Sequence, residues 1–66
     1  MMNYKEINKS NTSYEDFEKA CYECAKREPD VKYAYEGLDY AKSIDEIRNL
    51  YDHNTSVDSA VYLLCY

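Results

Sequence analysis

The best-defined hydrophobic pattern of the chain lies between residues 13 and 27. The apolar positions recur at i, i+3, i+7 and i+10, which is one face of an α-helix: Tyr14, Phe17, Cys21 and Cys24. Thr12 or Ser13 supplies the cap of a capping box at the start, paired with the acidic residue three positions on. Pro29 ends the helix because proline has no N–H to donate. We expect Phe17 at the centre of the buried face.

Residues 31–41 fit two patterns. The odd positions from Val31 to Tyr35 alternate with less apolar ones, as in a half-buried strand. The same segment also has helical spacing, with Asp30 as a cap, over a longer stretch: Val31, Ala34, Tyr35, Leu38 and Ala41. Gly37 opposes a helix by about 1 kcal/mol relative to alanine. The longer pattern makes the helix the favoured interpretation.

Two further segments complete the pattern. Ser43 and Glu46 form a second capping box, which predicts a short helix over residues 44–52. Residues 57–66 fit a helix entered through Thr55 or Ser56, although the apolar run from residue 61 would also suit a buried strand. Helix is again favoured.

These patterns predict a mostly α fold, a small bundle of three to four short helices. The chain has one glycine and one proline, so it offers little of the turn chemistry that β-hairpins need. The alternative is an α+β domain with strands near residues 31–36 and 60–66. We take residues 1–12 as a flexible N-terminal arm, with one short ordered stretch around residues 4–7, and residues 13–66 as a single small domain.

The length of 66 residues limits the function. A chain of this size buries only about 60% of the surface that its unfolded form exposes, so we expect no deep substrate pocket. The sequence contains no phosphate-binding glycine loop or HExxH motif. We therefore predict that the protein is not an enzyme and needs no cofactor. Its polar start and lack of a long apolar run predict a cytoplasmic protein without a membrane span.

The three cysteines are the most chemically suggestive residues. Cys21-x-x-Cys24 lies in the middle of a predicted helix, not at a helix N-terminus where the dipole activates redox thiols, so we expect buried, reduced thiols. A zinc site built from this pair with His53 and Cys65 is a minor alternative. We expect His53 to cap the end of the helix over residues 44–52.

Charge is distributed unevenly. Residues 1–27 carry equal numbers of acids and bases, so the net charge of −5 belongs to residues 28–66, where eight acids face three bases among many tyrosines. Tyrosine supplies contact area at low entropic cost, and carboxylates attract arginine and lysine. We therefore predict a partner-binding surface made of these residues: Glu36, Asp39, Tyr40, Asp45, Glu46, Tyr51, Asp52 and Asp58.

In size, acidity, tyrosine and asparagine content and absence of catalytic motifs, the chain resembles the small inhibitor proteins that phages and mobile elements direct against host defence, including anti-CRISPR proteins and DNA mimics. The resemblance implies an acidic face that blocks a basic, nucleic-acid-binding effector protein. The negative charge disfavours direct binding to nucleic acid or an anionic membrane. The alternative is a homodimerising structural or regulatory helical module, in which the apolar stripe and tyrosines serve oligomerisation.

Overall fold

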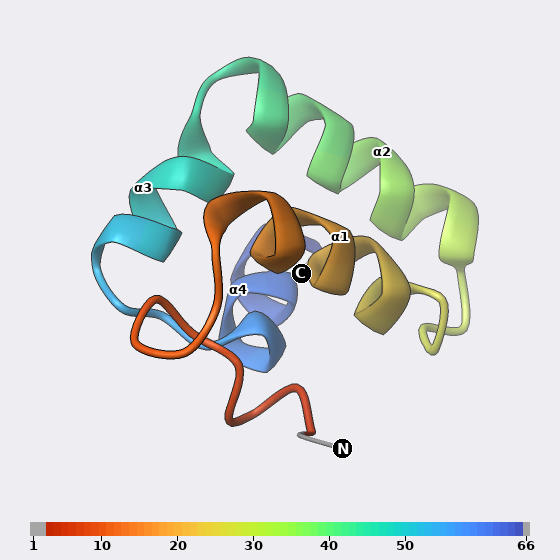
Figure 1. Cartoon of the computed structure of the whole chain (residues 1–66). Helices are drawn as coiled ribbons and strands as arrows, with labels where there is room; N and C mark the ends of the chain where they lie inside the picture. The colour runs from red at the N-terminus through yellow and green to blue at the C-terminus, as the bar shows by residue number, and fades with distance from the viewer. Residues whose placement is uncertain (1–2, 66) are drawn as a thin grey trace.

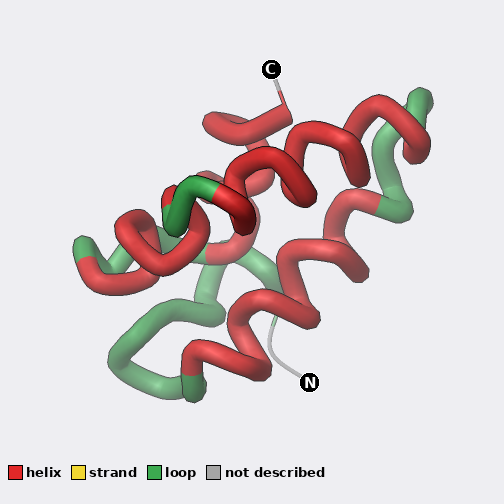
Figure 2. Tube along the Cα trace, turned by 90° about the horizontal axis from the view of Figure 1, so that it is seen from above, coloured by secondary structure: helices red, strands yellow, loops and turns green. Residues whose placement is uncertain are grey.

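The computed structural model describes residues 3–65, which form four helices and no strand. These are α1 (Tyr14–Ala25), α2 (Val31–Ser43), α3 (Glu46–Asp52) and α4 (Val57–Cys65), joined by short loops (Figures 1 and 2). The predicted small helical bundle is confirmed, and the α+β alternative is wrong for the described residues. No helix within residues 3–65 combines the length and apolar character that a membrane span requires.

The pattern of burial in α2 explains why this segment is a helix. Ala34, Leu38 and Ala41 are all buried, and they lie on one side of a helix. In a strand, Ala41 would point to the face opposite the other two, because side chains alternate. Only the helix buries all three together.

Side-chain caps start three of the helices. Ser13 accepts a hydrogen bond from the Asp16 N–H at 3.3 Å, which selects the second of the two predicted registers. Asp30 caps α2 by accepting from the Tyr33 N–H at 3.0 Å. Ser56 accepts from the N–H of Ser59 at 3.3 Å at the start of α4. Each cap satisfies a backbone donor that the first turn of a helix leaves without an intrahelical partner.

The predicted capping box of Ser43 and Glu46 is wrong. The Ser43 hydroxyl instead donates to the Tyr40 carbonyl at 2.7 Å, at the end of α2. Helix α3 begins at Glu46, two residues later than predicted, after Asp45 takes a left-handed conformation with φ of 58°. Short polar residues such as aspartate tolerate that conformation better than most. A sharp corner at Asp45 therefore separates α2 from α3.

All four helices contribute to one core. Phe17 is fully buried, as predicted, and its ring meets Tyr51 edge-on with the centroids 5.1 Å apart. The buried residues are Phe17, Ala20, Cys21, Cys24, Ala25, Ala34, Leu38, Ala41, Ile47, Val57, Ala60, Val61 and Cys65. Six of these are alanine or cysteine residues of α1 and α2. Because their side chains are small, the two helices approach their neighbours closely.

Residues 3–12 run beneath α1 and α4 as a series of turns (Figure 1). The Ile7 carbonyl accepts from the Val57 N–H at 2.9 Å, and the Tyr4 carbonyl accepts from the Asp58 N–H at 3.0 Å. Tyr4 and Ile7 also pack against the core. This stretch coincides with the ordered segment expected around residues 4–7, and it satisfies the first backbone donors of α4. The flexibility of the arm stays a prediction.

Candidate functional site

The predicted partner-binding residues of α2 lie on different sides of the helix. Glu36 and Tyr40 are exposed to solvent, and no described side chain forms an ion pair with Glu36. Asp39 instead accepts a hydrogen bond from the Tyr22 hydroxyl at 2.5 Å, which ties α2 to α1. The partial burial of Tyr22, together with the same hydrogen bond, raises the pKa of its phenol above the ordinary value. Asp39 thus has a structural partner.

The remaining predicted residues spread over three regions. Asp45 is exposed at the corner between α2 and α3, and Glu46, half-buried, follows it. Asp52 pairs with Arg48 at 3.8 Å on α3. Asp58 lies at the start of α4, next to the N-terminal segment. The predicted residues therefore lie on α2, at the corner before α3, on α3 and at the start of α4.

Tyr51 points into the fold. Its ring contacts Tyr14 and Phe17 edge-on, with centroid distances of 5.6 and 5.1 Å. Its hydroxyl donates to the Thr12 carbonyl at 2.7 Å, which anchors the segment leading into α1. These contacts give Tyr51 a structural role, and we leave it out of the candidate surface.

An exposed apolar stripe on α2 was missed by the sequence analysis. Tyr33, Tyr40 and Ile44 are 61%, 67% and 52% exposed and recur at i, i+7 and i+11, with Ile44 at the C-cap of the helix. That spacing is typical of a face that packs on another surface. Gly37 occupies the i+4 position of this row, where the backbone of α4 approaches it and no side chain is exposed.

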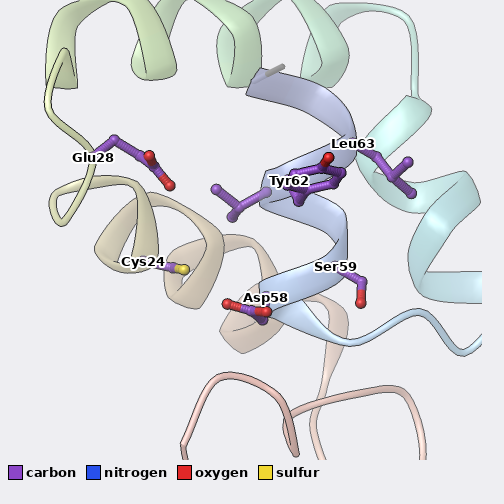
Figure 3. A pocket seen from close by; sticks show the side chains of 7 residues that line it. Cys24, Glu28, Asp58, Ser59, Tyr62 and Leu63 are labelled. Atoms are coloured by element: carbon purple, nitrogen blue, oxygen red, sulfur yellow. The ribbon is translucent and has the colours of Figure 1, made fainter.

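Helix α4 adds two more exposed apolar side chains, Tyr62 at 65% and Leu63 at 59%. They line a hollow of about 420 Å³ whose floor includes Cys24 and Val61 and whose edge carries the carboxylates of Glu28 and Asp58 (Figure 3). Figure 3 shows Glu28 and Asp58 reaching towards the same space from opposite ends.

A second hollow, of about 270 Å³, lies between the α1–α2 loop, α2 and the end of α4. Tyr33 forms part of its wall, and Glu28 borders both hollows. Tyr33 and the exposed residues of α4 therefore lie beside adjoining hollows, and together with Tyr40 and Ile44 of the α2 stripe they make up the candidate surface. We call it the tyrosine face and define it by its five exposed apolar residues: Tyr33, Tyr40, Ile44, Tyr62 and Leu63.

Acidic residues border the tyrosine face, whereas several nearby bases are engaged elsewhere. Lys42 pairs with Glu18 of α1 at 3.2 Å. Arg48 lies over the ring of Tyr14 at 4.7 Å, and Arg27 lies over the ring of Tyr4 at 5.4 Å. Exposed Lys32 is the base of α2 that has no such partner among the described residues. The carboxylates at the border are Glu28, Asp30, Glu36, Asp45 and Asp58.

All three cysteines are free thiols buried in the core. Cys21 is fully buried, and burial together with the nearby Cys24 and Cys65 raises the pKa of its thiol from 9.0 to about 12. The Cys65 thiol donates to the Ala34 carbonyl at 3.5 Å. His53 is the C-cap of α3, as predicted, and its Nδ1 lies 2.7 Å from the Asn49 carbonyl.

The described residues contain no group of three or more histidine, cysteine, aspartate or glutamate side chains placed to hold a metal ion. The minor zinc alternative, built on Cys21, Cys24, His53 and Cys65, therefore gains no support from the geometry.

Comparison of the chain with protein-family models, with curated proteins and with solved structures finds no match.

Proposed function

We propose that the protein is a small interaction protein that binds a basic, nucleic-acid-binding protein through the tyrosine face and blocks it, in the manner of an anti-CRISPR protein. The observation that carries the proposal is the exposed stripe of Tyr33, Tyr40 and Ile44 on a helix whose other side already fills the core. A helix with two apolar faces has one face left for a partner.

Charge favours a basic partner. Carboxylates border the tyrosine face. Glu36 follows Tyr33 by three positions and precedes Tyr40 by four, so the three residues lie along the same side of the helix. An arginine- or lysine-rich surface would meet these groups favourably, and its approach would be steered by the net charge of −5. A groove that normally holds nucleic acid has this character.

A homodimer is the second candidate, and the same apolar face supports it. Two copies that paired through this face would bring two acidic borders together, and like charges across an interface oppose association. We therefore rank the basic partner first.

Site-specific photocrosslinking tests the proposal in cells. A photoreactive phenylalanine analogue in place of Tyr40 should crosslink a basic nucleic-acid-binding protein, whereas the same analogue in place of exposed Lys19 on α1 should not. The purified partner should lose bound nucleic acid when the protein is added. Crosslinks of equal yield at both positions, or to a second copy of the chain alone, would contradict the proposal.

Matched charge variants then test the surface with the purified partner. Glu36→Lys with Asp45→Gly should weaken binding at least about tenfold, because two attractive contacts are lost and one becomes repulsive. Glycine suits the left-handed conformation of Asp45, so folding should survive. The control, Glu23→Lys with Glu15→Gln on the solvent side of α1, changes the net charge equally. An equal response of the two variants contradicts the proposal.

A further inference from the structure

The smaller of the two hollows has the shape of a site for a single side chain. Its volume of about 270 Å³ lies below the roughly 300–1,000 Å³ of typical small-molecule pockets. Its floor is made of two buried residues, Ala34 and Cys65, and the cysteine thiol already has an acceptor in the Ala34 carbonyl. The side chains of the floor are therefore apolar apart from a thiol that already has an acceptor.

The walls and edge of this hollow have a different character. Pro29 and the exposed ring of Tyr33 form apolar walls, while Glu28 and Asp30 contribute carboxylates. An aliphatic stem that ends in a cation would match both parts, because its methylene groups would cover the floor while its head meets the carboxylates. A planar guanidinium would also stack on an aromatic wall, and it is less strongly hydrated than an ammonium.

Helix ends also influence the charge that this hollow accepts. The N-terminus of α2 opposes a cation, but Asp30 already accepts a hydrogen bond from the Tyr33 N–H there and adds a full negative charge. Cys65 is the last residue of α4, and the C-terminal end of a helix carries partial negative charge. Arg27, the nearest preceding base in sequence, is held over the ring of Tyr4.

We propose that the hollow lined by Pro29, Tyr33, Ala34 and Cys65, with Glu28 and Asp30 at its edge, receives an arginine side chain of the protein partner. This inference rests on the proposed function and adds to it an anchor point. The hollow shares Tyr33 with the tyrosine face, so one partner surface would cover the stripe of α2 while one of its arginines enters the hollow.

Two small probes test the hollow without the partner. Titration with n-butylguanidinium, followed by NMR, should give saturable shifts centred on the amides of Tyr33, Ala34 and Cys65. The neutral isostere n-butylurea should shift them much less. Equal shifts with both probes, or shifts spread over the whole chain, would overturn the inference, because the hollow would then not select a cation.

Variants that remove the two charges but keep the side-chain shapes separate an effect on probe binding from an effect on folding. Glu28→Gln with Asp30→Asn keeps both shapes, and asparagine caps a helix as well as aspartate does. The pair should weaken n-butylguanidinium binding about fivefold or more, and the urea midpoint of unfolding, measured beside it, shows whether the fold is kept. Unchanged probe binding at full stability would overturn the inference.

The partner distinguishes the two proposals. If Glu36→Lys with Asp45→Gly weakens partner binding while Glu28→Gln with Asp30→Asn does not, the anchor is wrong and the proposed function stands. If the hollow selects n-butylguanidinium but Glu36→Lys with Asp45→Gly binds the partner normally, the proposed function is wrong while the cation site remains.

Discussion

Individual tyrosines of this chain have opposite roles that depend on where their rings lie. Tyr51 packs against Phe17 and donates to the Thr12 carbonyl, so it holds the core and the entry to α1 together. Tyr40 is 67% exposed, so most of its side chain lies in solvent. The same residue type therefore contributes stability at one position and a contact surface at the other.

At Cys21, burial determines how stability depends on pH. Its pKa is raised from 9.0 to about 12 because the thiolate would be desolvated in the core. The folded chain thus keeps a proton that the unfolded chain loses, so this group contributes stability that is fully present below about pH 9 and is lost as the pH rises towards about 12.

We expect the free energy of unfolding to fall between pH 9 and 11 more steeply in the natural chain than in Cys21→Ala. The slope that one thiol contributes is at most about 1.4 kcal/mol per pH unit. Urea titrations at several pH values measure both slopes, and the comparison removes the effect of the tyrosines and lysines. Identical slopes would show that Cys21 is accessible to solvent in the folded chain.

Helix α2 is the element on which both the fold and the proposed function depend. Its inner side buries Ala34, Leu38 and Ala41, and its outer stripe carries Tyr33 and Tyr40. Gly37 lies between them, where a β-carbon would stand 2.8 Å from the Leu64 carbonyl oxygen of α4. The glycine that appeared unfavourable for a helix is thus what lets α2 and α4 meet.

Gly37→Ala should destabilise the protein, by up to about 2 kcal/mol. Alanine favours the helix by up to about 1 kcal/mol, but overpacking against a backbone atom typically costs about 1–3 kcal/mol, and the end of α4 would have to move. The urea midpoint measures the change. Glu36→Ala, one residue away and exposed, is the control and should change the midpoint little. A stabilised Gly37→Ala variant would show that α4 yields easily at this point.

At the scale of the whole molecule, charge determines whether the tyrosine face stays free. The Cα radius of gyration is 10.5 Å, and a net charge of −5 on so small a body keeps copies apart. At the isoelectric point near pH 4.6 that repulsion vanishes while the apolar face remains exposed.

We therefore expect light scattering to give the monomer mass of 7.8 kDa at pH 7 and about 50 mM salt, and a larger mass near pH 4.6. Ile44→Asp should suppress the association at low pH because it removes an apolar contact from the stripe. A dimer mass at pH 7 that survives low salt would place the homodimer ahead of the basic partner.

Local rules predicted a helix in each of the four segments, although they left a strand as the alternative for the segments of α2 and α4. The stripe of α1, the caps at Ser13, Asp30 and Ser56, and the helix end before Pro29 depend on residues within four positions of one another. The sequence also contained the acidic character of residues 28–66, although it could not say which carboxylates share a surface.

Tertiary packing alone decided which side chains remain for a partner. Tyr51 and Asp39 are residue types that suit a recognition surface, but Tyr51 donates to Thr12 and Asp39 accepts from Tyr22, which lie 39 and 17 positions away along the chain. The two hollows likewise need α4 to end against α2, which the close approach at Gly37 allows. Periodicity reports which face of a helix is apolar, but whether another element covers that face depends on contacts between distant parts of the chain.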